Sequence, residues 1–150
     1  MPTSHQYIFV LWGAQCEEAP AAIFVSELRA AGLRVKVVGL DGIHANGTHG
    51  LALLPDITLS QALPLARLAS CIILPCAPAT LQRMAGDPRL QEFVMLAQAE
   101  QALFVVEGAV HPQLPEIGLE VANLGEDVLI YPLGAALFDF THEIIHALSG

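Results

Sequence analysis

Short apolar runs alternate along the chain with longer segments in which apolar residues recur every three or four positions. The short runs are typical of strands buried on both faces, as in a parallel sheet, and lie at residues 7–12, 35–40, 70–74, 103–106 and 127–131. The longer segments predict amphipathic helices at residues 20–31, 60–69, 89–102 and 135–148. This alternation predicts an α/β fold, a flavodoxin-like three-layer sandwich with a mostly parallel sheet.

The connecting segments are rich in turn-forming residues. Residues 41–50 contain three glycines and two histidines and predict a loop, and residues 51–59 predict a short β-excursion around Pro55 and Asp56. We expect a further loop at 75–79 and irregular structure at 111–120, where two prolines interrupt any period. Pro20 suits the first turn of the first helix, and Gly32 suits its end.

Length and composition indicate the class of protein. A chain of 150 residues can form one domain, 1–150, with one sizeable core. Although 54% of the residues are apolar, no uninterrupted apolar run approaches the ~18 residues that a membrane helix needs. Residues 1–6 lack the basic and apolar segments of a signal peptide. The three cysteines, an odd number, argue against a disulfide framework, so we expect a cytoplasmic protein.

The charge of the chain restricts its partners. Fifteen acidic residues against six Lys and Arg give a net charge of −9. Such a chain repels polyanions, so we expect neither a nucleic-acid partner nor an anionic membrane. The chain is apolar and has few charged residues to keep its surface soluble. We therefore expect a homodimer that buries part of its apolar surface.

The stretch A-L-F-V-V-E-G-A-V at 102–110 indicates where chemistry would lie. In open parallel sheets, ligands gather just beyond the carboxyl ends of the strands. Glu107 and Gly108 follow the strand predicted at 103–106 directly. Position 107 is therefore well placed for a functional residue, but its carboxylate makes a poor nucleophile.

Several segments form a succession that runs along nearly the whole chain. They are G-A-Q-C-E-E at 13–18, A-A-G-L-R-V-K-V-V-G-L at 30–40, L-A-L-L-P-D-I-T-L at 51–59, C-I-I-L-P at 71–75, D-V-L-I-Y-P-L-G at 127–134 and A-L-F-D-F-T-H-E-I-I-H-A-L-S-G at 136–150. In this order they resemble the DJ-1/PfpI (ThiJ) superfamily, which is related to class I glutamine amidotransferase domains. The resemblance implies a flavodoxin-like fold and cysteine-dependent chemistry of the hydrolase, deglycase or glyoxalase type.

The same resemblance implies that the catalytic parts of the family are missing. The glutamate at the fourth position of the family's Glu-Glu-x-Glu stretch is replaced by Pro20, unless Glu18 takes its role through a shifted loop. The family's Gly-Gly turn, whose backbone amide helps to form an oxyanion hole, reads Cys76-Ala77 here. The nucleophilic cysteine falls on position 106 or 107. The segment that carries the partner histidine is largely deleted, because residues 118–127 are too few for it.

Cys76 is the sharpest alternative nucleophile. It follows a predicted strand and precedes Pro78, so it would lie near a helix N-terminus, where free amides and the helix dipole stabilise a thiolate. No Lys or Arg lies close in sequence, and carboxylates that would face the same crevice oppose ionisation of the thiol. These carboxylates are Glu17, Glu18 and Glu107. The favoured interpretation of Cys76 is a small buried residue that fills the space of the family's glycine.

Glu107 and the other two cysteines are further candidates. Glu107 would act as a general base, or as a metal ligand together with His111 and Glu18; the alternative is a carboxylate that caps loop amides. Cys16, in the first loop after a strand, is either redox-sensitive or a neutral loop residue. Cys71 is predicted to be an ordinary buried residue of a strand.

Histidines offer a weaker metal hypothesis. His142 and His146 form an H-E-x-x-H motif, a signature of zinc proteases with both histidines on one helical face. Only four residues follow His146, so the third ligand that zincins take downstream is missing, and surface histidines are the better interpretation. His44 and His49 lack a visible third partner. No P-loop, dinucleotide fingerprint or Ser-His-Asp order is present, so we expect no cofactor.

The resulting hypothesis is a shortened, dimeric DJ-1/PfpI-like protein that is catalytically inactive and binds a small molecule or a protein at the old active-site crevice. That crevice is predicted at Glu17, Glu18, Cys76, Ala77, Glu107, Gly108 and His111. The alternative is an active enzyme that uses Cys76 or Glu107 in place of the missing nucleophile. An enzyme would present a reactive, solvent-reachable thiol. An inactive protein would bury Cys76 and fill the cleft with side chains such as Phe104 or Val106.

Overall fold

Parallel strands form one sheet in the computed structural model, which describes residues 6–119 and 127–149. Within these ranges the sheet has six strands in the order β3-β2-β1-β4-β5-β6. The strands are β1 (Tyr7–Trp12), β2 (Val35–Gly39), β3 (Ile57–Thr58), β4 (Ala69–Leu74), β5 (Leu103–Val106) and β6 (Val128–Ile130). All neighbouring strands run parallel. The predicted fold class, a flavodoxin-like α/β sandwich, is thereby confirmed.

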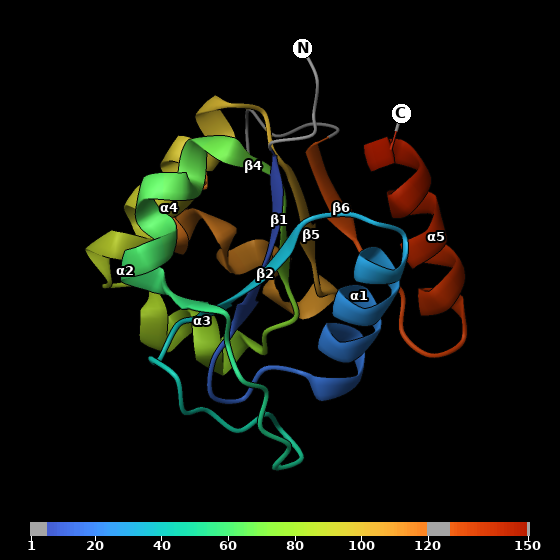
Figure 1. The fold of residues 1–150 in the computed structure, drawn as a ribbon. Coiled ribbons are helices and arrows are strands. Elements are labelled where there is room, and N and C mark those ends of the chain that lie inside the picture. Colours follow the sequence, from blue (N-terminus) through green and yellow to red (C-terminus); the bar gives the residue numbers. More distant parts are fainter. Residues whose placement is uncertain (1–5, 120–126, 150) are drawn as a thin grey trace.

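Helices cover both faces of the sheet, as Figure 1 shows. One face carries α1 (Glu18–Ala30) and α5 (Ala136–Ser149), which pack against each other. The other face carries α2 (Leu59–Ala62), the 3₁₀ helix η2 (Leu63–Leu68), α3 (Pro78–Met84) and α4 (Pro88–Ala99). A second 3₁₀ helix, η3 (Gly108–Ile117), packs against α3. Three layers result, with the sheet in the middle.

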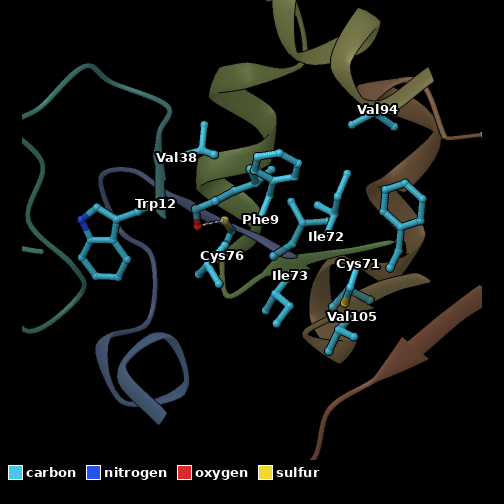
Figure 2. Packing of buried hydrophobic residues seen from close by; sticks show 14 of the residues in the cluster. Phe9, Trp12, Val38, Cys71, Ile72, Ile73, Cys76, Val94 and Val105 are labelled. Carbon is cyan, nitrogen blue, oxygen red and sulfur yellow. Dashed lines mark hydrogen bonds between the residues drawn. The ribbon is translucent and has the colours of Figure 1, made fainter. Parts of the chain in front are cut away.

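The central strands are buried on both faces, which is why they are apolar at consecutive positions. In β1 the residues from Phe9 to Trp12 have no exposed surface. Val10 pairs with Val37 of β2 on one side and with Ile73 of β4 on the other. Figure 2 shows part of the resulting apolar cluster, to which Cys76 also belongs.

Aromatic side chains join the sheet to both helical layers. The Phe9 ring of β1 meets the Phe93 ring of α4 edge to face, with 5.3 Å between centroids. On the opposite face, Phe24 of α1 meets Tyr131 in the same manner at 5.5 Å, and Phe140 of α5 at 6.4 Å. Edge-to-face pairs add to the free energy of area burial. These contacts fix the helices over the strands whose carboxyl ends carry the candidate site.

Most predicted elements are confirmed, but several segments differ. The strands at 7–12 and 103–106 have the predicted bounds. The predicted loop at 75–79 was wrong at its end, because Pro78 is the first residue of α3, a position that needs no N–H donor. Residues 111–117 follow the 3₁₀ helix η3 instead of an irregular path. Its prolines lack the N–H groups that a regular α-helix would use.

The excursion at 51–59 is also simpler than predicted. Ile57 and Thr58 join the sheet as β3, parallel to β2, whereas Ala52 forms only an isolated bridge with Asn46. The predicted deletion at 118–127 concerns residues of which 120–126 lie outside the described ranges. Within those ranges, no helix combines the length and apolar character needed to cross a membrane.

Replacing Phe93 by Ala tests the contact between α4 and the sheet. We expect Phe93→Ala to lower the free energy of unfolding by about 3–5 kcal/mol, because a fully buried ring leaves a cavity against Phe9. Met95→Ala, on the same helix but 59% exposed, is the control and should change it by less than about 0.5 kcal/mol. Urea unfolding followed by the fluorescence of Trp12 measures both. Equal losses in the two variants would contradict this packing.

Candidate functional site where the strand order reverses

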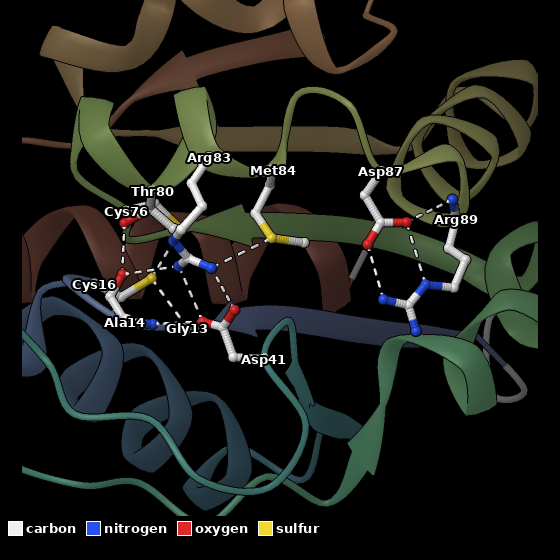
Figure 3. A network of polar contacts seen from close by, with 10 residues as sticks. All are labelled: Gly13, Ala14, Cys16, Asp41, Cys76, Thr80, Arg83, Met84, Asp87 and Arg89. Atoms are coloured by element: carbon white, nitrogen blue, oxygen red, sulfur yellow. Dashed lines mark hydrogen bonds and ion pairs between the residues drawn. The ribbon is translucent and has the colours of Figure 1, made fainter.

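Two cysteines meet at the carboxyl ends of β1 and β4. Cys16 lies between β1 and α1, Cys76 lies between β4 and α3, and their backbones pair as an isolated antiparallel bridge. The Cys16 thiol donates a hydrogen bond to Cys76 Sγ, with 3.0 Å between the sulfur atoms (Figure 3). The strand order reverses between β1 and β4, and such a switch point is where open parallel sheets bind ligands. We therefore take it as the centre of the candidate site.

Neither thiol reaches solvent, since both cysteines have no exposed surface. The N–H of Gly13 donates to Cys16 Sγ at 3.3 Å, and the Cys76 thiol points to the carbonyl of Leu11 at 4.0 Å. The hydrogen bond with Cys16, burial and the nearby Glu17 carboxylate together raise the pKa of Cys76 well above its ordinary value. Because the thiolate is the nucleophile, this raised pKa disfavours attack by Cys76 on a substrate.

Arg83 and Asp41 close one side of the cysteine pair. Arg83 of α3 forms a two-pronged ion pair with Asp41, whose second contact, Nη2 to Oδ2, measures 2.9 Å. Asp41 also accepts the N–H of Ala14 at 2.8 Å, and Thr80 donates its hydroxyl to the Ala14 carbonyl at 2.8 Å. Burial opposes the charge of Asp41, but its hydrogen bonds from Arg83 and Ala14 lower its pKa. The loop after β1 is thus tied to α3 and to the end of β2.

A pocket of about 310 Å³ opens beside the cysteine pair, at the N-terminus of α1. It is lined by Glu17, Glu18, Ala19, Pro20, Thr48, His49 and Ala77. The predicted crevice residues Glu17, Glu18 and Ala77 are therefore together, and each cysteine precedes one wall residue. Burial and the neighbouring Glu107 and Glu18 carboxylates raise the pKa of Glu17. The pocket is a region of concentrated negative charge.

Glu18 anchors the loop that forms the far wall of the pocket. Its Oε2 accepts the N–H groups of His49 at 2.6 Å and Leu51 at 3.1 Å. Burial opposes its charge, yet these bonds lower the pKa of Glu18 below its ordinary value. The loop comes so close at Gly47 that an added Cβ would lie 2.5 Å from the Glu18 Cδ, which explains a glycine there. Glu18 thus binds the backbone of this loop through Oε2, while its Oε1 is buried and has no hydrogen-bond partner among the described residues.

Glu107 occupies the place after β5 but has no reactive geometry. Its carboxylate accepts the N–H of Ala109 at 2.7 Å and caps η3, which Gly108 begins. A nucleophile elbow is a sharp, strained turn, whereas the φ of Glu107, −75°, is ordinary extended backbone. This arrangement fits the capping alternative raised from the sequence. His111 lies half-buried further along η3.

The histidines that the structure describes are not gathered into a metal-binding cluster. Within residues 6–119 and 127–149, no three His, Cys, Asp or Glu side chains are placed to hold one, so Glu107, His111 and Glu18 do not form a metal site. His142 lies exposed on α5, where its Nε2 is 3.1 Å from Glu27 of α1 and its ring stacks on Phe138. His146 is also exposed.

Sequence reasoning missed three participants in the site. Asp41 and Arg83 lie 42 positions apart, so no local pattern joins them. A helix starting at Pro78 would have been the signal for Arg83, because Thr80 and Arg83 then share one helical face. Tyr131, just after β6, is buried with its hydroxyl unpartnered among the described residues. Burial, followed by the charge of Glu17, raises its pKa strongly.

Known structures match this fold closely. DJ-1beta of Drosophila melanogaster superposes with a TM-score of 0.76 at 18% identity, over 97% of this chain and 91% of that one. A mutant of a DJ-1 superfamily protein from Salmonella typhimurium gives 0.76 at 19% identity, over 97% and 91%. A two-domain protein of Anabaena variabilis with DJ-1/ThiJ/PfpI-like and ferritin-like domains gives 0.71 at 20% identity, over 96% of this chain and 48% of that one.

The chain therefore has the fold of DJ-1/PfpI superfamily proteins over nearly its whole length. The family resemblance inferred from the succession of segments is confirmed at the level of the fold. No protein-family model matches the sequence, and no curated protein matches it significantly. At identities of 16–20%, the side chains at the site have to be judged on their own contacts.

The pH dependence of stability tests the role of Glu18. Because its folded-state pKa is lowered, Glu18 stabilises the fold above its ordinary pKa of 4.5, and this contribution is lost as pH falls through the lower folded-state value. We expect Glu18→Gln to be less stable than wild type at pH 7 and the difference to shrink in acid. Urea unfolding at about pH 7 and about pH 3 measures this. Glu92→Gln, exposed on α4, is the control; a constant deficit for Glu18→Gln would contradict the role.

Proposed function

We propose that this protein is a non-catalytic binding module, which holds a small amine or guanidinium compound in the pocket between Glu17 and His49. The observation that carries the proposal is the state of the thiols beside this pocket. Cys16 and Cys76 are fully buried and hydrogen-bonded to each other, while a carboxylate stands after β5. What remains open to a ligand is a pocket with carboxylates in its wall.

The groups at the site cannot perform thiol-dependent acyl transfer as they stand. That chemistry needs a thiolate with a base within hydrogen-bond reach. Cys76 has a raised pKa and is bonded to a second sulfur. Glu107 is bonded to the backbone of its own 3₁₀ helix. An enzyme that used either residue, the alternative reading of the site, would first have to rearrange it.

Charge favours a cationic ligand. Two carboxylates, Glu17 and Glu18, line the pocket, and the pKa of Glu17 is raised first by burial and then by repulsion from Glu107 and Glu18. The N-terminus of α1 contributes only about half a positive charge, which does not offset two carboxylates. A bound cation would relieve the repulsion, and the net charge of −9 would attract it from a distance. The volume of about 310 Å³ suits a small molecule.

Assembly and location complete the proposal. A homodimer is supported by exposed apolar side chains in the segment after β2, where Ile43 and Leu51 are each 53% exposed and Leu54 is 81% exposed. These residues expose apolar area that a second copy would cover. A cytoplasmic location is supported by the three free cysteines, which a reducing compartment preserves.

Alkylation distinguishes the binding module from a thiol enzyme. We expect iodoacetamide at neutral pH to leave all three thiols of the native protein unmodified over the minutes in which it labels the urea-unfolded chain, because all three are buried. Mass spectrometry counts the modified cysteines. Rapid labelling of Cys76 in the folded protein, together with an activity lost in Cys76→Ser, would establish the enzyme instead.

Titration with small cations tests the ligand class. We expect putrescine and methylguanidine to bind and succinate not to bind, and we expect Glu17→Gln to weaken cation binding about fivefold or more. Because a cation favours ionised Glu17, whose pKa is raised, affinity should increase as pH rises from about 5 to about 7. Isothermal titration calorimetry measures both effects.

The control for this titration is Glu92→Gln, which removes the same charge from an exposed position on α4 and should leave the affinity unchanged. Equal weakening in both variants would show a general effect of net charge and no specific site. Binding of succinate in preference to the cations would overturn the ligand class.

A further inference from the structure

We propose that Cys16 and Cys76 are a redox-active dithiol, which a hydroperoxide converts into an intramolecular disulfide across the switch point. The two sulfur atoms are 3.0 Å apart, whereas a disulfide bond is about 2.05 Å long, so they have to approach by only about 1 Å. The residues lie 60 positions apart in sequence. The fold, and not a local turn, therefore brings them together.

The backbone holds both cysteines in place for this bond. Their chains pair as an antiparallel bridge, and the N–H of Glu17 donates to the carbonyl of Pro75 at 2.6 Å. On its other side Cys16 accepts the N–H of Thr48 at its carbonyl, at 3.0 Å. Once one sulfur has been oxidised, the other thiol attacks it as if it were present at a very high concentration. A disulfide between them is therefore favoured over one with a free thiol.

The two sulfur atoms have different neighbours, which indicates different roles in the reaction. Cys16 Sγ accepts the Gly13 N–H, a donor that stabilises negative charge on this sulfur, while Arg83 lies close enough to interact with both sulfur atoms. Cys76 has the Leu11 carbonyl and the Glu17 carboxylate for neighbours, which disfavour its thiolate. Cys16 is thus the attacking residue, and Cys76 is the resolving residue.

The chemistry balances in two steps. Cys16 attacks the O–O bond of the hydroperoxide ROOH, which gives the sulfenic acid Cys16–SOH and releases the alcohol ROH. The Cys76 sulfur then attacks the Cys16 sulfur, and the hydroxyl group leaves with the Cys76 proton as water. Overall, two thiols lose two electrons to the peroxide. Since both thiols are buried, the smallest oxidant, hydrogen peroxide, should react most readily.

The disulfide would connect two walls of the pocket, because Glu17 follows Cys16 and Ala77 follows Cys76 in the chain. Oxidation would thereby fix the loop after β1 to the loop after β4. Formation of the disulfide depends on the geometry of the two sulfur atoms and not on the ligand of the pocket. Its test accordingly uses no ligand.

Peptide mapping after peroxide treatment tests the proposal. Trypsin cleaves after Arg29, Arg67 and Arg83, so Cys16 is released in peptide 1–29 while Cys71 and Cys76 share peptide 68–83. The measurement is therefore made on Cys71→Ala, whose remaining two cysteines leave one assignment. We expect a mass loss of about 2 Da and a single cross-linked species of peptides 1–29 and 68–83, which dithiothreitol reverses.

Thermal unfolding gives a second readout. A bond that closes so long a loop restricts the unfolded chain, so oxidation should raise the Tm of Cys71→Ala by roughly 5 °C or more. In the wild type, peroxide should reduce the number of free thiols from three to one. Cys71→Ala/Cys76→Ala lacks the resolving thiol and should show neither the cross-link nor the rise in Tm.

Three outcomes would overturn the proposal. Both thiols of Cys71→Ala could persist under peroxide that oxidises the unfolded chain. Cys16 or Cys76 could instead stop at sulfinic acid, or the cross-link could join two copies of the chain. Each outcome is visible in the mass of the intact protein, even if a cysteine variant fails to fold. None of them bears on cation binding, so failure of this proposal and failure of the proposed function are distinguishable.

Discussion

The pairing of β1 with β4 is the contact on which the rest of the site depends. Phe9 pairs with Ile72 and Val10 with Ile73, so both strands end at the same edge of the sheet. Because the strands are parallel, the loops that leave them meet there, and Cys16 comes into contact with Cys76. The helices on either side begin directly after these loops. Apolar pairing in the centre of the sheet thus positions polar groups at its edge.

The chemistry at this edge follows from what burial does to each group. The contact with Cys16 and burial raise the pKa of Cys76, and both sulfur atoms are hidden from solvent, while backbone N–H groups hold Glu18 in its charged form. Glu17 lies between these extremes, partly buried and beside other carboxylates. The fold shared with DJ-1/PfpI superfamily proteins therefore surrounds, in this chain, a pocket whose wall carries two carboxylates.

The elements that the sequence predicted well are those whose pattern reflects burial alone. Strands 7–12 and 103–106 are continuous apolar runs because they are covered on both faces, and their bounds are as predicted. The helix that begins at Pro78 was missed because it is only seven residues long, too short to show a clear hydrophobic period. The packing of η3 against α3 joins two separate segments of the chain, and no local pattern records such a contact.

The candidate site, like the fold, could be predicted from the sequence only in part. Residue types and their order placed Glu17, Glu18 and Ala77 at one edge of the sheet, because loops after parallel strands share an edge. The sequence also indicated that position 107 lacks a nucleophile. It did not indicate that Cys16 touches Cys76, that Arg83 reaches Asp41, or that Glu18 serves the loop at Gly47.

The amino-acid sequence by itself thus determined the layers, the parallel sheet and the presence of a carboxylate at position 107, because each follows from the residue type at a position and the period around it. Only the tertiary structure decided which side chains share the space at the switch point. Contacts between residues 30 to 60 positions apart, such as Glu18 with His49 and Cys16 with Cys76, depend on how strands pair. The packing of the whole core determines how the strands pair, and no single segment does so.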